Sequence, residues 1–449
     1  MSPPGKPRGA SWKWWVCAAL LLATMLNYMD RQTLSLTATQ LKTEIHLDDG
    51  RYGHLERWFS YAFATGGIFF GFIADRVGPR RLYPFVLVGW SIAGLASPLA
   101  INPHVLEMFA TPGDPGSGEF RWLFLCRTVL GFFEAGHWPC ALLTARNVLS
   151  AEQRPLGNSI LQSGASLGAL LTPLVIQAIR ATGAPWQAPF LIIGAIGMLW
   201  VPMWFALVRR NDLHYVRAEK AKDAPPIHLG RVLFQLVVLV TIVVTISLAW
   251  QFQRAWLPKY LKEVHLKEIY QVDLTEDPKA TTERIESTAN YFTSGYYIVA
   301  DLGCLFFGGV VSILTWRNLH VRWARLVSFS LCTGLIALSA LVPNMGRGPG
   351  VMICLLAVGA GALGAHPQYY ALVQELPARH MGFLSGLLAA TSWVAVGYMQ
   401  GSMGDYIKKT GSYDLPMVVT GLAPVAGLIA MATWAAFGSK TQALASRAA

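Results

Sequence analysis

Apolar runs recur along the whole chain, and most have the length that a helix needs to cross a bilayer. Two clear examples are Phe190–Val208 and Leu233–Trp250. A membrane-spanning helix needs about 20 mostly apolar residues. The pattern predicts twelve such spans, at residues 14–37, 57–76, 82–101, 121–146, 155–179, 189–208, 233–261, 289–314, 326–342, 350–376, 384–404 and 416–437.

This pattern predicts an all-α polytopic membrane protein with twelve transmembrane helices in two six-helix bundles. Short alternating strands, which a membrane barrel would need, do not occur in the sequence. The longest predicted cytoplasmic connection separates six spans from six. We therefore expect an N-terminal bundle over 1–208, a cytoplasmic linker over 209–232 and a C-terminal bundle over 233–449.

Composition supports a membrane protein and argues against a nucleic-acid-binding one. Hydrophobic residues make up 53% of the 449 residues and charged residues only 14%, against about 25% charged in soluble domains. The net charge of +11 comes from basic residues in short loops between spans. Such loops usually lie in the cytoplasm, so we expect both termini there. The external loops 102–120 and 262–288 are interpreted as surface loops with a possible gating role.

The six cysteines all fall inside apolar stretches and none has CxxC spacing. Small core residues are the simpler interpretation, with no disulfide and no metal. The sequence contains no HExxH, GxSxG or paired-cysteine motif, so we expect neither an enzyme nor a bound cofactor.

The loop between the second and third spans reads Gly71-Phe-Ile-Ala-Asp75-Arg76-Val-Gly78-Pro-Arg80-Arg81. It resembles the signature loop of the major facilitator superfamily. Gly78 permits a tight turn, and the arginines hold the loop at the cytoplasmic surface. The resemblance implies a conformational latch made by Gly71, Asp75, Arg76, Gly78 and Arg80, in which Asp75 meets the start of the eleventh span.

Two further spans contain charged residues inside hydrocarbon, where such residues usually face a cavity or a partner. The first contains Asn27-Tyr28-Met29-Asp30-Arg31. In the fourth, Arg127, Gly131 and Glu134 follow i, i+4, i+7 spacing and share one helix face, so we expect Gly131 to leave room beside the two charges. Both strings are similar to motifs of the anion:cation symporter branch of that superfamily, which includes carriers of hexuronates, galactonate and glucarate.

The resemblance implies a role for each of these residues. Arg31 and Arg127 would bind the substrate anion, and Tyr28 would form a hydrogen bond with it. Asp30 and Glu134 would be the protonation sites that couple anion to proton. Elementary electrostatics agrees, since two cations and two carboxylates inside hydrocarbon should face one another. A substrate anion that competes for an arginine would raise the proton affinity of the carboxylate.

The remaining candidates are less specific. The fifth span contributes Gln162 within a run of small residues that serves helix packing as readily as substrate contact. In the second half, Arg254 is a third candidate anion contact or a residue that snorkels to the outer surface. His366 and Gln368 are candidate substrate contacts in the tenth span. Gly136-His137-Trp138-Pro139 and Ala365-His366-Pro367-Gln368 form a weak echo between the halves, as expected of parallel repeats.

These observations together predict a secondary active transporter of a small organic anion, such as a sugar acid, working by alternating access. Proton-coupled symport is the expected mode, and the expected partners are the anion, protons and the lipid bilayer. We expect a functional monomer in a cell membrane, most simply a bacterial inner membrane. The alternatives are an organophosphate/phosphate antiporter and, from another class, a membrane anion sensor.

Overall fold

The chain divides into two compact helical units, Met1–Glu219 and Lys220–Ala449. The computed structural model describes residues 11–149, 154–209, 212–213, 229–266, 269, 278–346, 348–373 and 381–445. The boundary between the units lies inside the predicted linker 209–232, most of which is outside the described residues, as is most of the predicted loop 262–288.

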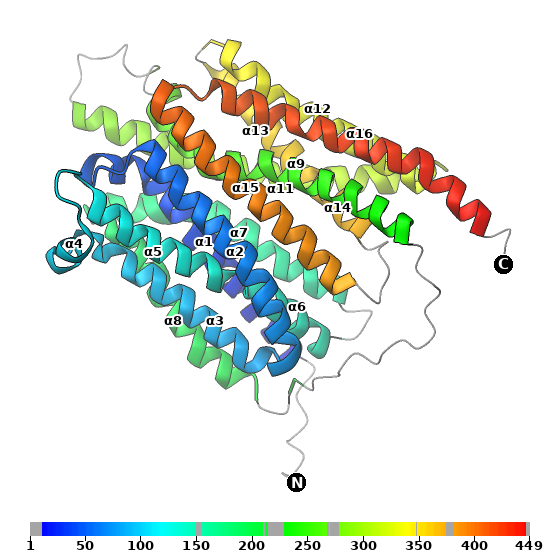
Figure 1. Cartoon of the computed structure of the whole chain (residues 1–449), viewed down its shortest axis with the longest axis horizontal. Coiled ribbons are helices and arrows are strands. Elements are labelled where there is room, and N and C mark those ends of the chain that lie inside the picture. Colours follow the sequence, from blue (N-terminus) through cyan, green and yellow to red (C-terminus); the bar gives the residue numbers. More distant parts are fainter. Residues whose placement is uncertain are drawn as a thin grey trace, which may run out of the picture. The chain divides into compact units, whose positions relative to one another are not determined.

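The first unit (blue to green in Figure 1) is built from long helices joined by short connections. Its elements are α1 (Trp12–Glu44), α2 (Asp49–Val77), α3 (Pro79–Ala96), the 3-10 helix η1 (Ser97–Ile101), α4 (Pro103–Phe109), α5 (Ser117–Glu134), α6 (His137–Val148), α7 (Arg154–Ala181) and α8 (Gln187–Leu207). Local signals set the boundaries: Asp48 caps α2 by accepting from Arg51 N at 2.9 Å.

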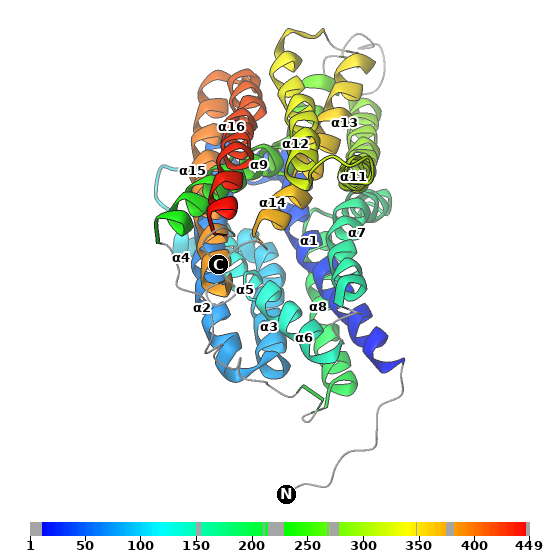
Figure 2. The same cartoon turned by 90° about the vertical axis from the view of Figure 1, so that its right-hand side faces the viewer.

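The second unit (green to red in Figures 1 and 2) is also built from helices joined by short connections in its described residues. Its elements are α9 (Leu229–Tyr260), the π-helix η2 (Leu261–His265), α11 (Pro278–Trp316), α12 (Val321–Ala337), the 3-10 helix η4 (Leu338–Asn344), α13 (Pro349–Gly364), α14 (His366–Val373), α15 (Met381–Thr410) and α16 (Asp414–Ala445).

Each of the twelve predicted spans has a helical counterpart in the structure. Within the described residues, eight segments are long and apolar enough to cross a membrane by length and hydropathy alone. Two helices that do not meet this test, α1 and α5, have charged side chains inside their predicted spans. The prediction of an all-α polytopic membrane protein is confirmed.

The two units repeat the same pattern of helix neighbours. In the first unit α1 packs on α7, α2 on α5 and α3 on α8. In the second unit the helices at equivalent places in the order make the same pairs, α9 with α15, α11 with α13 and α12 with α16. This correspondence is what two parallel repeats of six spans produce, and it is much clearer than the weak sequence echo.

Two spans predicted as continuous helices, 121–146 and 350–376, are in fact interrupted. The first divides into α5 and α6 at Ala135 and Gly136, and the second into α13 and α14 at Ala365. A proline follows each break, Pro139 in one and Pro367 in the other. Proline has no N–H to donate to the preceding turn, so the helix cannot continue with regular hydrogen bonds. The breaks therefore fall at the two echoed sequences.

Glycines allow close helix contacts in the first unit. A Cβ on Gly164 of α7 would lie 2.3 Å from the carbonyl oxygen of Leu21, and one on Gly168 would lie 2.5 Å from that of Met25. No side chain larger than hydrogen fits at such distances. These small residues of the fifth predicted span therefore serve the packing of α7 on α1.

The connection from α3 to α5 is fastened to the start of α2. Arg51 donates from Nη2 to Asp114 Oδ1 at 2.5 Å and from Nη1 to the carbonyl oxygen of Pro115 at 2.8 Å. Gly116 takes a left-handed conformation with φ of 76°, which glycine adopts without strain. The predicted surface loop 102–120 thus has a defined structure that includes α4.

Candidate functional site

Two ion pairs lie in the interior of the first unit. Arg31 of α1 donates from Nε to Glu134 Oε2 of α5 at 2.6 Å. Arg127 of α5 donates from Nη2 to Glu56 Oε1 of α2 at 3.1 Å. The arginine side chains are 3% exposed and the glutamate side chains 0% exposed. Helices α1, α2 and α5 therefore meet at a cluster of four buried charged side chains.

Both arginines lie near one phenylalanine ring. The Arg127 guanidinium carbon lies 4.5 Å from the centre of the Phe59 ring, and that of Arg31 lies 5.5 Å from the same ring. The Arg31 guanidinium carbon also lies 4.6 Å from the centre of the Phe63 ring and 5.3 Å from that of the Tyr28 ring. Aromatic faces attract cations, so these rings hold the guanidinium groups in place without neutralising them. Tyr28, predicted to contact substrate, thus packs beside one of the predicted anion-binding arginines.

The role predicted for Gly131 is wrong. It was expected to leave room beside the charges of Arg127 and Glu134. A Cβ there would instead lie 2.5 Å from the carbonyl oxygen of Phe59. Gly131 therefore brings the backbone of α2 against α5, and the space beside it is filled by protein. The close contact between α2 and α5 places Phe59 and Glu56 beside the arginines.

Asp30 precedes Arg31 and belongs to the same charged region. It is 6% exposed and lies in electrostatic range of Glu134, Arg127 and Arg31. A Cβ on Gly94 of α3 would be 3.4 Å from its Oδ1, so this carboxylate points toward α3. The cluster then contains three carboxylates and two guanidinium groups, which leaves it one negative charge in excess when all are ionised.

Asn27, one turn before Arg31 on α1, is a buried polar residue of a different kind. Its side chain is 0% exposed, and neither amide atom has a hydrogen-bond partner among the residues that the structure describes. Burying an amide without a partner is costly. A polar group left in this state next to a charged cluster marks a place where a ligand or water can bind.

Glu56 is the functional candidate that the sequence analysis missed. The second predicted span began at residue 57, one residue after Glu56. The structure begins α2 at Asp49, and Glu56 is 0% exposed. The sequence did contain a sign that Glu56 is buried: the aromatic residues Tyr52 and Phe59 lie one helical turn before and after it. Both are buried in the structure.

The signature loop is held to its own unit at one end. Gly78 has a φ of 78°, which agrees with the tight turn predicted there. Arg80 donates from Nε to the carbonyl oxygen of Val208 at 3.1 Å, at the end of α8, where a cation is favoured by the helix dipole. Arg76 is exposed and stacks on Phe72 with its guanidinium carbon 3.3 Å from the ring centre.

Two predicted site residues have side chains that the structure does not describe, Asp75 at the end of α2 and Gln162 in α7. The remaining latch residue, Gly71, has open space around it, since a Cβ there would meet nothing within 4 Å.

The other predicted residues lie in the second unit. Arg254 is buried and donates from Nε to Gln251 Oε1 of its own helix at 2.6 Å. His366 begins α14 and its Nδ1 lies 2.9 Å from the carbonyl oxygen of Ala362. Gln368 donates to Ser328 Oγ at 2.8 Å and to the Phe307 carbonyl oxygen at 3.3 Å. The Gln368 amide thus joins α14 to α12 and α11.

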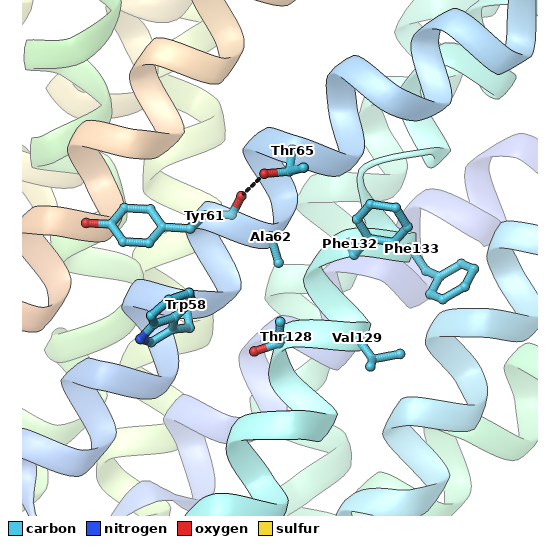
Figure 3. Close-up of a pocket in the computed structure, with 8 residues that line it drawn as sticks. All are labelled: Trp58, Tyr61, Ala62, Thr65, Thr128, Val129, Phe132 and Phe133. Atoms are coloured by element: carbon cyan, nitrogen blue, oxygen red, sulfur yellow. Dashed lines mark hydrogen bonds between the residues drawn. The ribbon is translucent and has the colours of Figure 1, made fainter.

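A pocket of about 380 Å³ lies between α2 and α5 (Figure 3). It is lined by Trp58, Tyr61, Ala62, Thr65, Thr128, Val129, Phe132 and Phe133. None of these side chains is charged, and the four residues of the ion pairs are not among them. The pocket therefore lacks the groups that an anion requires, and the charged cluster is the better candidate site.

The family assignment agrees with this architecture. The model of the Major Facilitator Superfamily matches residues 20–402, so the chain belongs to that family. It is 24% identical over 433 residues to a probable sulfoacetate transporter of Cupriavidus necator, covering 92% of each protein. It is also 24% identical over 411 residues to a D-galactonate transporter of Escherichia coli, covering 86% of this chain and 88% of that protein.

A solved structure of a D-xylose-proton symporter has the same fold. It superposes with a TM-score of 0.72 at 15% sequence identity, covering 94% of this chain and 97% of that chain. The protein is therefore a membrane-spanning secondary transporter and not an enzyme. The predicted family, the anion and sugar-acid branch and the fold are confirmed.

Proposed function

We propose that the protein moves a small carboxylate-bearing organic anion, such as a sugar acid, together with protons by alternating access. The observation that carries the proposal is the pair of buried arginines, each held by a glutamate at 2.6 Å and 3.1 Å. The names of its relatives, transporters of sulfoacetate and D-galactonate, support an organic acid as substrate.

The chemistry follows from competition for the guanidinium groups. A buried ion pair is stable only while both partners are present. An anion that binds Arg31 or Arg127 takes the place of Glu134 or Glu56. A carboxylate left without its cation in a low-dielectric interior is stabilised by protonation. Anion binding and proton uptake are then linked in both directions, with Asp30 as a third carboxylate that shares the proton.

The proposed topology places both termini in the cytoplasm. Its support is the basic loops of the sequence analysis. In this arrangement the signature loop around Asp75 lies at the cytoplasmic surface, where it acts as a latch on one conformation. The working unit is a monomer in a bacterial inner membrane.

A transport panel in proteoliposomes tests the proposal. Labelled sugar acids, short sulfonated carboxylates and organophosphates are offered to the same preparation with and without a pH gradient. We expect accumulation of a carboxylate that depends on the gradient. Exchange of organophosphate for phosphate with no effect of the gradient would instead identify an antiporter. Binding of an anion with no flux in either direction would identify a sensor.

A further inference from the structure

His137 is a fully buried residue that begins α6 directly after the break from α5. It joins three helices. Its Nε2 lies 3.1 Å from Thr24 Oγ1 of α1, and its Nδ1 lies 2.9 Å from the Tyr83 hydroxyl of α3. The Tyr83 ring packs in turn against Trp200 and Trp204 of α8, with ring centres 5.0 Å and 5.4 Å apart.

The neighbouring bonds determine which nitrogen of His137 has the proton. Thr24 Oγ1 already donates its proton to the carbonyl oxygen of Leu20 at 2.9 Å. It can therefore only accept from the histidine, so Nε2 bears the proton and Nδ1 accepts from the Tyr83 hydroxyl. Both nitrogens of the neutral ring are used, and the imidazole has one orientation that satisfies them.

The hydrogen bond between His137 and Thr24 is a second contact between α1 and the α5–α6 junction, two turns of α1 away from the Arg31–Glu134 pair. We call it the histidine level. Thr24 and Arg31 are seven residues apart on α1, so they lie on the same face two turns apart. Glu134 and His137 are three residues apart across the helix break. Helix α1 is thus joined to the α5–α6 junction twice, once by an ion pair at 2.6 Å and once by a neutral hydrogen bond at 3.1 Å.

We propose that His137 is a positioning residue that keeps the carboxylate of Glu134 in register with Arg31. Around the break the backbone bonds are irregular, with Gly136 N bonded to the carbonyl oxygen of Phe133, three residues back, at 3.0 Å. Helical continuity alone therefore does not fix Glu134. The two bonds of His137 do so by attaching the junction to α1 and α3.

The consequence for transport rests on the proposed function. An anion at Arg31 opens the ion pair, while the histidine level contains no charged group for it to displace. Glu134 then stays within reach of Arg31 through the cycle, so that release of the anion and of the proton remain linked. Without the histidine level, the junction can shift while the ion pair is open, and the anion can move without its proton.

The second unit supplies a matched control. His366 has the same place at the α13–α14 break, before a proline in each case, but its hydrogen bond goes back to Ala362 of the preceding turn at 2.9 Å. That bond joins α14 only to α13, the helix directly before the break. Its ring also lies edge-on to Trp250 of α9, with ring centres 6.4 Å apart, so His366→Leu removes a histidine at an equivalent break while an apolar side chain still faces α9.

The first experiment does not depend on the substrate. Infrared difference spectra of the purified full-length protein are recorded without anion, and the carboxyl band of Glu134 is identified by its loss in Glu134→Gln. We expect His137→Leu to shift that band. His137→Gln should leave it in place, because the amide donates and accepts at the two positions, and His366→Leu should also leave it in place. An unshifted band in His137→Leu overturns the proposal.

The second experiment measures coupling in proteoliposomes. We expect His137→Leu to lower pH-driven accumulation about tenfold more than counterflow, since buried partners lose their bonds. His137→Gln should restore both and keep the wild-type pH profile. A His137→Gln variant that behaves like His137→Leu would show that the imidazole acts as a proton carrier, which overturns the positioning role.

A milder change at the same contact serves as the control for misfolding of His137→Leu. Thr24→Val keeps the shape of the side chain and removes only the oxygen that accepts from Nε2. If His137→Leu does not yield folded protein, Thr24→Val should give the same band shift and the same selective loss of accumulation. Normal values for both in Thr24→Val would overturn the proposal. If the wild type accumulates no sugar acid, the proposed function fails while the infrared result still decides the position of Glu134.

Discussion

The two units share their helix pairing but differ in the chemistry of their interiors. In the first unit, charged side chains join different helices, as in the buried pair of Arg31 and Glu134. In the second unit, Arg254 donates from Nε to the side-chain amide of Gln251 in its own helix. The ion pair of Lys259 with Glu263 at 3.2 Å likewise follows i, i+4 spacing along one continuous stretch.

Two neutral hydrogen bonds join helices of the second unit. Trp256 donates from Nε1 to Gln400 Oε1 at 2.6 Å, and Gln400 donates to the carbonyl oxygen of Gln251 at 3.0 Å. These bonds join α9 to α15. Neutral hydrogen bonds do not respond to an arriving anion or proton as an ion pair does. The ion pairs between helices of the first unit are therefore the contacts on which the proposed proton coupling rests.

The largest expected effect is the loss of binding when an arginine of the first unit is removed. Arg31→Ala and Arg127→Ala should each weaken anion binding by about two orders of magnitude or more, the range of strong buried charged hydrogen bonds. Arg254→Ala in the second unit should cost less. Calorimetry on the purified variants measures all three.

Loss of one partner also leaves a buried charge, which can destabilise by about 3–5 kcal/mol. Arg31→Ala combined with Glu134→Gln removes both charges and serves as the folding control. Near-native affinity in both single arginine variants, or an Arg254→Ala defect as large as theirs, would contradict the asymmetry between the units.

The next effect in size concerns coupling. Glu134→Gln should still bind and exchange anion when substrate is present on both sides, because an amide imitates the protonated acid. It should fail to accumulate anion under a pH gradient, since no proton is taken up there. Counterflow and pH-driven uptake on one preparation measure this, with Glu263→Gln of the second unit as the variant that retains both. Full pH-driven uptake in Glu134→Gln would shift the role to Asp30 or Glu56.

A smaller effect is expected where the units are alike. A Cβ on Gly131 meets α2, and one on Gly303 would lie 2.6 Å from the Cα of Ala360 in the equivalent helix pair of the second unit. Both Gly131→Ala and Gly303→Ala should lower stability by about 1–3 kcal/mol, the usual cost of overpacking. Gly295→Ala, where a Cβ meets nothing within 4 Å, is the control. Thermal unfolding in detergent would reveal any inequality between the two repeats.

The smallest effect is expected at the signature loop. Asp75→Asn should slow transport several-fold and leave equilibrium affinity close to wild type, because the loop is proposed to act on conformation rather than on substrate. Arg317→Ala, in the short connection between α11 and α12 of the second unit, should change less. Initial rates in proteoliposomes alongside calorimetry separate the two quantities. A normal turnover number in Asp75→Asn would remove the latch from the proposal.

The sequence was sufficient to predict the helices, because long apolar runs in a membrane protein have one stable secondary structure. It could also predict that Arg31, Arg127 and Glu134 would be near one another, since charges inside hydrocarbon seek partners. Which carboxylate pairs with which arginine depends on how α2, α5 and α1 are rotated. That rotation is set by contacts such as Gly131 on Phe59, which periodicity does not contain.

Three errors have a common origin in the use of hydropathy. Glu56 was excluded because charge lowers a window average even when the side chain is buried. The breaks at Gly136 and Ala365 were missed because apolar content continues across them. In each case a local property, a single carboxylate or a proline with no N–H, decided the structure, while the average was taken over about 20 residues.

The fastened connection between α3 and α5 offers a practical handle for fluorescence and spin-label work. The segment after α4 is tied to α2 through Arg51 and Asp114, and Met108 of α4 is 77% exposed. All six native cysteines are buried or partly buried. A cysteine introduced in place of Met108 would therefore react ahead of them, and its probe would sit on a short anchored helix whose own motion adds little to the signal.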